Sequence, residues 1–104
     1  MPRYAARKDG NQDGIVAALR GAGYHVTPTH QLGQGFPDLV VTGYSIPLEA
    51  VAALLVELKV ANEGLTEKEQ KFHTGYPDGG PLIIARNADD VLRWFGRYDE
   101  TTEL

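Results

Sequence analysis

The sequence contains no cysteine, and this absence excludes several classes of protein. Disulfide scaffolds, iron–sulfur clusters and zinc sites with cysteine ligands all need thiols. Long apolar runs are absent too, since the longest, Ala50–Val56, falls far short of the roughly 20 residues that cross a bilayer. No secretory signal is expected, because the charged first residues are not followed by an apolar core of the required length. We therefore expect a cytoplasmic protein that does not bind membranes.

The 104 residues are enough for one compact domain and too few for two. Hydrophobic residues make up 42% and charged residues 23%, which is ordinary for a globular protein and gives no sign of disorder. We expect a single domain over residues 1–104, with a core at about 9–96 and flexible tails at 1–8 and 97–104.

A formal net charge of −4 argues mildly against a nucleic-acid partner, because duplex-binding domains are usually basic. Two observations weaken this argument. A bound cation offsets acidic side chains that are gathered at a metal site. In addition, six of the ten basic residues form two groups, one toward each end of the sequence: Arg3, Arg7 and Lys8, and Arg86, Arg93 and Arg97.

Hydrophobic periodicity predicts a first helix that is capped by Asn11 and ends near Arg20. Its expected buried stripe follows the i, i+3, i+4, i+7 rule and consists of Ile15, Ala18, Leu19 and Ala22. Farther along, Thr66 followed by Glu69 has the form of a capping box and predicts a second helix to about His73.

Runs rich in β-branched and apolar residues predict strands at 24–27, 39–42, 54–60 and 82–85. Pro28 is expected to end the first strand, and Gly43–Pro47 to form a turn after the second. Residues 48–53 fit either a turn of helix or the start of a strand. Asn87 is expected to cap a last helix that Gly96 ends. The order helix, three strands, helix, strand, helix predicts an α/β fold, with a mixed central β-sheet and helices on both faces.

Two short motifs, Gly-Phe-Pro-Asp at 35–38 and Glu-Leu-Lys at 57–59, each adjoin an apolar run. Because side chains alternate along a strand, Glu57 and Lys59 are expected on one face, with Leu58 in the core. If the two strands pair, Asp38 converges with both.

These residues have the chemistry of a metal-dependent phosphodiesterase. Asp38 and Glu57, with the backbone carbonyl of Leu58, would supply oxygen ligands to Mg²⁺ or Mn²⁺. Lys59 would orient or help to deprotonate the attacking water, or stabilise the charge that develops on the phosphate. Either motif alone is common, and a strand that ends in charges is usually just solvated. Their order, spacing and placement on strands favour the catalytic interpretation.

With these motifs the chain resembles the PD-(D/E)xK nuclease superfamily, most closely small phage and prophage nucleases related to the VRR-NUC and Holliday-junction-resolvase-like groups. The resemblance extends over about residues 9–96 and includes Pro-Asp-Leu-Val-Val, Leu-Val-Glu-Leu-Lys, and Leu65-Thr66 with Gln70. It implies a restriction-endonuclease-like core of order αβββαβ, followed here by a C-terminal helix. It further implies a metal-dependent DNA endonuclease, with junctions or flaps among its substrates, that acts as a homodimer in a bacterial or phage-infected cell.

One departure from these relatives concerns the first helix, where many of them carry a glutamate that reaches the metal. The matching position here is Gln12, a poor Mg²⁺ ligand that can still hydrogen-bond a metal-bound water. Asp13 replaces the acid if the register shifts, or both residues simply form a polar first turn. Gln70 resembles a glutamine that relatives place near the active site, and it equally fits an exposed helix position. Gln12 and Gln70 are both retained as candidate catalytic residues.

Two other functions compete with the nuclease. A domain that retains the fold for binding DNA or protein, with weak or lost catalysis, would fit the acidic charge and the missing helix glutamate. A structural or adaptor protein of a phage particle or toxin system has no direct support from the sequence. Arg86 follows a strand and is a candidate phosphate contact, although a solvated arginine is the default.

Overall fold

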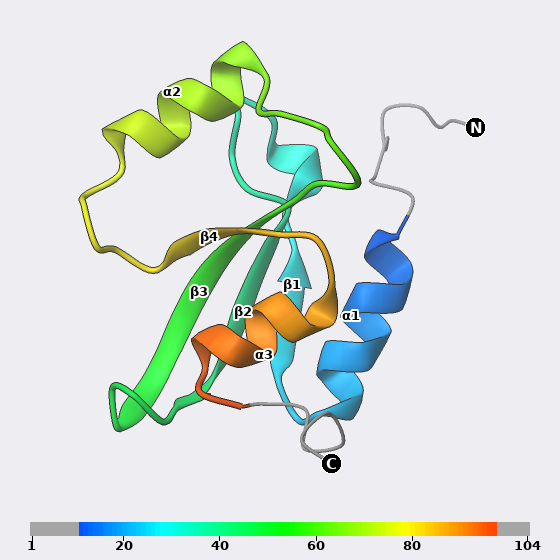
Figure 1. The fold of residues 1–104 in the computed structure, drawn as a ribbon, viewed down its shortest axis with the longest axis vertical. Helices are drawn as coiled ribbons and strands as arrows, with labels where there is room; N and C mark the ends of the chain where they lie inside the picture. The colour runs from blue at the N-terminus through cyan, green and yellow to red at the C-terminus, as the bar shows by residue number, and fades with distance from the viewer. Residues whose placement is uncertain (1–10, 98–104) are drawn as a thin grey trace.

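The computed structural model describes residues 11–97 of the chain (Figure 1). The expected tail at 1–8, and all of the tail at 97–104 except Arg97, lie outside the described residues. Within residues 11–97 the elements follow the expected order of helices and strands: α1 (Gln12–Gly21), β1 (His25–Pro28), the 3₁₀ helix η1 (His30–Leu32), β2 (Leu39–Ser45), β3 (Ala50–Leu58), α2 (Glu67–Gly75), β4 (Leu82–Ala85) and α3 (Ala88–Trp94).

The strands form one mixed sheet in the order β1-β2-β3-β4. The first three are antiparallel neighbours, and β4 runs parallel to β3. A parallel pair needs a long crossover, and the segment that contains α2 provides it. The prediction of a small α/β domain with a mixed sheet is thus confirmed.

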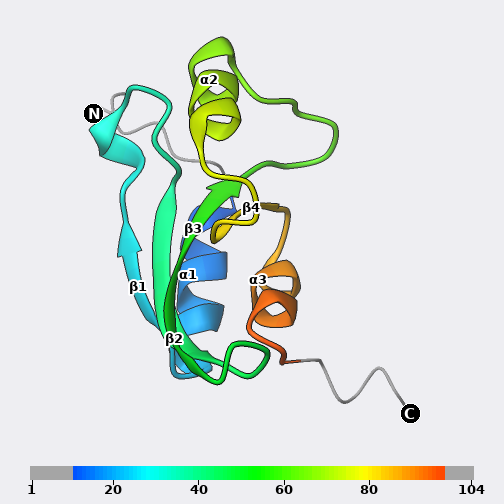
Figure 2. The ribbon, with the colours of Figure 1, turned by 90° about the vertical axis from the view of Figure 1, so that its left-hand side faces the viewer.

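The expectation of helices on both faces of the sheet is wrong. Helices α1 and α3 lie on the same face, and α2 lies beyond the end of the sheet (Figure 2). The reason is the distribution of apolar residues: α1 and α3 have buried residues that enter the core, whereas α2 has none. Most of the opposite face therefore carries no helix from residues 11–97.

The core fills the space between the sheet and these two helices. Alternate residues of β2 and β3 point into it, and Leu39, Val41, Leu54 and Val56 are fully buried. Helix α1 contributes Ile15, Val16 and Leu19, α3 contributes Val91, and Phe95 enters the core directly after α3. No helix within residues 11–97 has the length and apolar character to cross a bilayer.

Helix α1 differs from its prediction in two respects. Ala18 is exposed, and the buried stripe instead contains Gln12 and Val16 with the expected Ile15 and Leu19. The Asn11 side chain does not cap the helix, and its Nδ2 instead donates a hydrogen bond to the Arg86 carbonyl at 3.2 Å. Because the buried stripe of α1 includes Gln12, this polar side chain points into the protein and not into solvent.

The β2–β3 hairpin is longer than expected. The predicted turn at Gly43–Pro47 is wrong in its first half, because Gly43, Tyr44 and Ser45 pair with residues of β3. A side chain at Gly43 would collide with the ring of Tyr24, so glycine allows this aromatic residue to pack against the strand. Residues 50–53, left open by the sequence, are the start of β3.

Strand β1 ends at Pro28, as expected, although this proline is itself the last residue of the strand and pairs with Leu39. An edge strand tolerates proline because one side of the strand needs no hydrogen-bond donor. The expected caps of the later helices are confirmed. Thr66 and Glu69 form the reciprocal capping box of α2, and Asn87 Oδ1 accepts a hydrogen bond from the Asp90 amide at 2.9 Å.

Candidate active site

Strand pairing brings the two sequence motifs together. Asp38 directly precedes β2, and Leu39 pairs with Val56 of β3. The Leu58 amide donates a hydrogen bond of 2.8 Å to Asp38 Oδ2, which fixes this carboxyl beside Glu57. The two carboxyls interact, and each affects the pKa of the other. Asp38, Glu57 and Leu58 thus meet at one end of the sheet, as the sequence predicted.

The backbone at Asp38 is held by the segment that follows β1. The Thr29 amide donates to the Asp38 carbonyl, and Thr29 Oγ1 donates to the Pro37 carbonyl, each at 2.7 Å. Pro37 is buried and restricts its own φ. Asp38 therefore projects from a rigid strand entrance rather than from a mobile loop.

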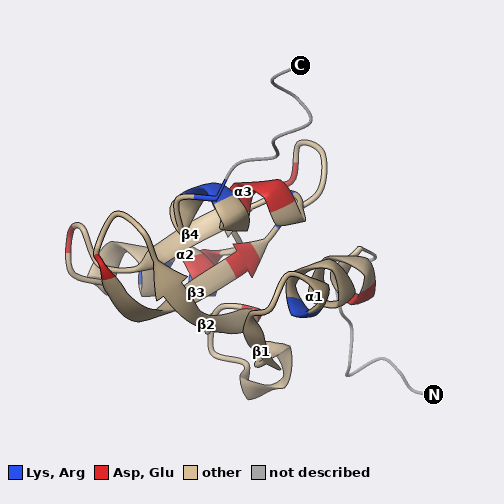
Figure 3. Ribbon diagram, turned by 90° about the horizontal axis from the view of Figure 1, so that it is seen from below, with Lys and Arg blue, Asp and Glu red and all other residues tan. Residues whose placement is uncertain are grey.

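Glu57 is the single Asp, Glu, Lys or Arg residue in the four described strands. Figure 3 shows this as a sheet that is tan except at one end of β3. Its side chain is 2% exposed, and Oε1 is buried without a hydrogen-bond partner. Burial, reinforced by the charge of Asp38, raises the pKa of Glu57 from 4.5 to about 9. Burial also raises the pKa of Asp38, although the Leu58 amide opposes this.

Lys59 lies beside these carboxyls and is largely buried as well. Its Nζ is 2.8 Å from Glu69 Oε1 and 3.8 Å from Glu57 Oε2. Burial lowers the pKa of Lys59, but the hydrogen bond and charge of Glu69 outweigh it, so the net shift is upward. Lys59 is therefore held as a charged ammonium that pairs with the Glu69 carboxylate and lies near the carboxyl group of Glu57.

Glu69 is the residue of this site that sequence reasoning missed, since it was assigned only to the cap of α2. Its Oε1 accepts from both the Thr66 amide, at 2.9 Å, and the Lys59 ammonium. These two donors outweigh the effect of burial and lower the pKa of Glu69. The capping box is the sequence signal that could have identified Glu69 as a site residue, because it fixes the direction of this side chain. Gln70, the predicted residue of α2, is exposed, and its catalytic role remains a prediction.

Helix α2 reaches the site through the glycine-rich loop before Asp38. Gly35 has a φ of 80°, and a side chain there would collide with the backbone of Lys68 in α2. The adjacent Phe36 packs edge-on against Phe72 of the same helix, with ring centroids 5.3 Å apart. This close approach explains how a helix without buried residues of its own is held over the carboxyls.

Gln12 is 1% exposed and points toward the segment that braces Asp38. Its Nε2 lies 3.2 Å from His30 Nδ1, and its Oε1 is buried without a partner. His30 directly follows Thr29. Gln12 also borders a cavity of about 290 Å³ between α1 and the residues after β1, whose wall includes the exposed Asp13. Gln12 is thus a buried residue connected to the site, rather than part of a solvated first turn.

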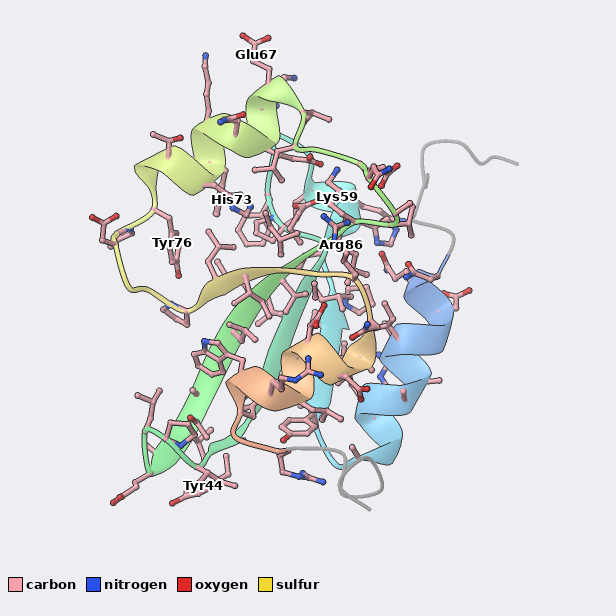
Figure 4. The ribbon with its side chains drawn as sticks, viewed as in Figure 1. Tyr44, Lys59, Glu67, His73, Tyr76 and Arg86 are labelled. Atoms are coloured by element: carbon pink, nitrogen blue, oxygen red, sulfur yellow. The ribbon has the colours of Figure 1, made fainter. Side chains whose placement is uncertain are left out.

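Arg86 lies at the same end of the sheet as Lys59 (Figure 4). The Lys59 amide donates to the Ala85 carbonyl at 3.1 Å, and the two basic residues directly follow the neighbouring strands β3 and β4. Arg86 is exposed, and its Nη1 donates to the Ala61 carbonyl at 2.7 Å. Since a guanidinium has five N–H donors, others are available for a phosphate.

The donor set fits a Mg²⁺ ion. Asp38 and Glu57, the one half-buried and the other buried, repel each other when both are ionised, and Glu57 Oε1, which has no hydrogen-bond partner, offers a ligand atom. Mg²⁺ keeps several waters and needs only one or two protein carboxylates. Within residues 11–97, no group of three or more histidine or acidic side chains is arranged as a ready-made metal cage.

Comparison of the chain with known protein families, with curated proteins and with solved structures gave no match.

Proposed function

We propose that this protein is a Mg²⁺- or Mn²⁺-dependent deoxyribonuclease of the PD-(D/E)xK type. The observation that carries the proposal is the pair of neighbouring carboxyls, half-buried Asp38 and buried Glu57, beside the buried ammonium of Lys59. A sheet that is otherwise free of charged residues has no structural need for this arrangement. Burying ionisable groups together is unfavourable and is therefore characteristic of functional sites.

Asp38 and Glu57, with the Leu58 carbonyl, would hold the metal ion. The bound ion would supply a polarised phosphoryl oxygen and a water of lowered pKa. Lys59 donates hydrogen bonds to the attacking water or to the phosphate as negative charge develops there. Glu69 keeps Lys59 charged and in place, and Arg86 binds a neighbouring phosphate of the DNA strand.

The proposal extends to the subclass of nuclease. The element order and the sequence motifs support a restriction-endonuclease-like fold and a relationship to the VRR-NUC or Holliday-junction-resolvase-like nucleases. A structure-specific endonuclease that acts on junctions or flaps, as a homodimer in the cytoplasm, is the form that this relationship implies.

The test is cleavage of a labelled panel of linear duplex, single strand, flap and four-way junction in Mg²⁺ or Mn²⁺. We expect metal-dependent cutting that is lost in Lys59→Ala and retained in Lys71→Ala, a matched change at an exposed position on α2. If Lys59→Ala cut the DNA as fast as Lys71→Ala, the role assigned to Lys59 would be refuted. The preferred substrate would identify the subclass.

A DNA-binding module without catalysis is the second candidate. Two observations favour it: the ammonium of Lys59 is already paired with Glu69, and Gln12 stands where many members of the superfamily that the chain resembles carry an acid. In this case the panel would be bound but not cut, and Asp38→Ala would not change the affinity.

A further inference from the structure

The inner face of α2 is marked by its partly buried residues. Glu69, Phe72, His73 and the C-cap residue Tyr76 are half-buried, whereas every other residue of the helix is exposed. These four positions have the i, i+3, i+4, i+7 spacing of one helical face. Since Glu69 on this face pairs with Lys59, His73, one turn farther along, faces the same site. Figure 4 shows His73 on the side of α2 toward Lys59 and the sheet.

The ring of His73 has a buried nitrogen that no protein group satisfies. Within residues 11–97 its Nε2 has no hydrogen-bond partner, although buried polar atoms are normally paired because leaving them unpaired is costly. A histidine with a purely structural role would be expected to have such a partner. The buried Glu57 Oε1 is unpaired as well. Both atoms belong to residues beside the ion pair of Lys59 and Glu69, so a group from outside the chain is needed to complete this site.

His73 is held in the form that accepts a proton. Burial lowers the pKa of its imidazole below 6.5, the charge of Glu69 opposes this shift, and the charge of Lys59 adds to it. These two are the charged groups of residues 11–97 that act on the ring, one from α2 itself and one from the end of β3. The imidazole is therefore neutral at pH 7 and has a lone pair on one ring nitrogen.

The other polar groups of the site are already engaged. Lys59 Nζ is paired with Glu69 at 2.8 Å, and an ammonium has donors but no acceptor. Asp38 and Glu57 are the carboxyls assigned to the metal ion, whose charge makes them weak bases. Hydrolysis of a phosphodiester nevertheless needs an acceptor for the proton of the attacking water. The unpaired nitrogen of His73 is the acceptor that remains.

We propose that His73 is the general base of this site and takes a proton from the attacking water. The proposal rests on the nuclease function and adds a catalytic residue to it. As the water oxygen bonds to phosphorus, its proton passes to His73 Nε2, which requires that the ring's own proton be on Nδ1. The bond from phosphorus to the leaving oxygen breaks, the electron pair stays on that oxygen, and the oxygen takes a proton from solvent. His73 then releases its proton to solvent.

The first test compares His73→Gln with His25→Gln, a matched change at an exposed position of β1. Both full-length variants are assayed at saturating Mg²⁺ on the DNA that the wild type cuts fastest. We expect the single-turnover rate of His73→Gln to fall by about 100-fold or more, as is usual when a general base is lost, and that of His25→Gln to be unchanged. Urea unfolding checks that both variants are folded.

Two further readouts separate a base from a residue that only positions α2. The kcat/KM of the wild type should rise with pH up to the pKa of His73 and then level off, and His73→Gln should lack this rise. In His73→Ala, added imidazole should restore part of the rate, because the free base can enter the vacated space. Apart from activity, NMR titration of the His73 ring, assigned with His73→Gln, should give a pKa below 6.5 that matches the kinetic one.

The outcomes that overturn the proposal differ from those that overturn the nuclease function. If the wild type cuts DNA and His73→Gln cuts as fast as His25→Gln, His73 is not the base and the nuclease function stands. The same conclusion follows if His73→Gln is slow but keeps the wild-type pH profile while imidazole does not restore His73→Ala. A wild type that cuts none of the DNA substrates overturns the nuclease function, and the role of His73 with it.

Discussion

Replacing Glu57 by glutamine is expected to stabilise the metal-free protein. Glutamine has the shape of the protonated carboxyl and can still donate a hydrogen bond toward Asp38. The wild type, by contrast, must take up a proton to fold at neutral pH, because the pKa of Glu57 is about 9 in the folded state and 4.5 in the reference state. The variant avoids this requirement.

The magnitude follows from the linkage between protonation and folding. Because the folded pKa is the higher one, the stability contributed by the proton is fully present below about pH 4.5 and is lost as the pH rises toward 9. Across that window the free energy of unfolding falls by about 1.4 kcal/mol per pH unit. At pH 7 the wild type is thus about 3 kcal/mol less stable than Glu57→Gln.

Urea unfolding in EDTA between pH 5 and 9 measures this difference, with the fluorescence of Trp94, the single tryptophan, as the signal. Glu57→Gln should make the free energy of unfolding depend less on pH. Glu67→Gln, at an exposed position of α2, should leave this dependence unchanged. Saturating Mg²⁺ should stabilise the wild type by a few kcal/mol and leave Glu57→Gln unchanged. A wild type of constant stability from pH 5 to 9, or a less stable Glu57→Gln at pH 7, would contradict the reasoning.

Two further predictions concern single contacts. Glu69→Gln keeps the capping box but removes the charge that holds Lys59, so it should lower the kcat of the proposed DNA cleavage at least tenfold with little change in stability, whereas Glu69→Ala should also lose about 1 kcal/mol in urea unfolding. Equal activity of Glu69→Gln and wild type would disprove the positioning role. Gly43→Ala should destabilise the fold by about 1–3 kcal/mol, because the new methyl group meets the ring of Tyr24. Gly14→Ala, in open space on α1, should instead stabilise it by up to about 1 kcal/mol, and the opposite signs are checked in the same urea titrations.

The sequence was sufficient for the order of the elements and for the meeting of Asp38 with Glu57. Both depend on local signals: apolar runs, caps, and the two-residue period of a strand. It was insufficient where distant residues decide the local structure. Gly43 extends β2 because Tyr24, from another element, packs against it, and Pro28 stays in β1 because that strand lies at the sheet edge.

The same distinction applies to the candidate site. Gln12 was identified, but its burial depends on which face of α1 meets the sheet, and the stripe was predicted with Ala18 in place of Val16. Glu69 was seen only as a cap, because no local pattern shows that Lys59, ten residues earlier, returns to the same oxygen. The sequence alone does not show which side chain of α2 reaches the candidate site, because this depends on how that helix packs.

The dual role of Glu69 explains how α2 is positioned without a hydrophobic face. A helix without buried residues has little apolar area to fix its place. Here its first turn is tied to β3 through one oxygen that accepts from the Thr66 amide and from Lys59. Loss of the Lys59 ammonium should therefore weaken the docking of α2 as well as any catalysis. In hydrogen exchange, Lys59→Met should expose the amides of α2 more than those of α1, which has its own buried stripe. Equal protection of α2 in this variant and the wild type would show that the packing of Gly35 and Phe36 alone holds the helix.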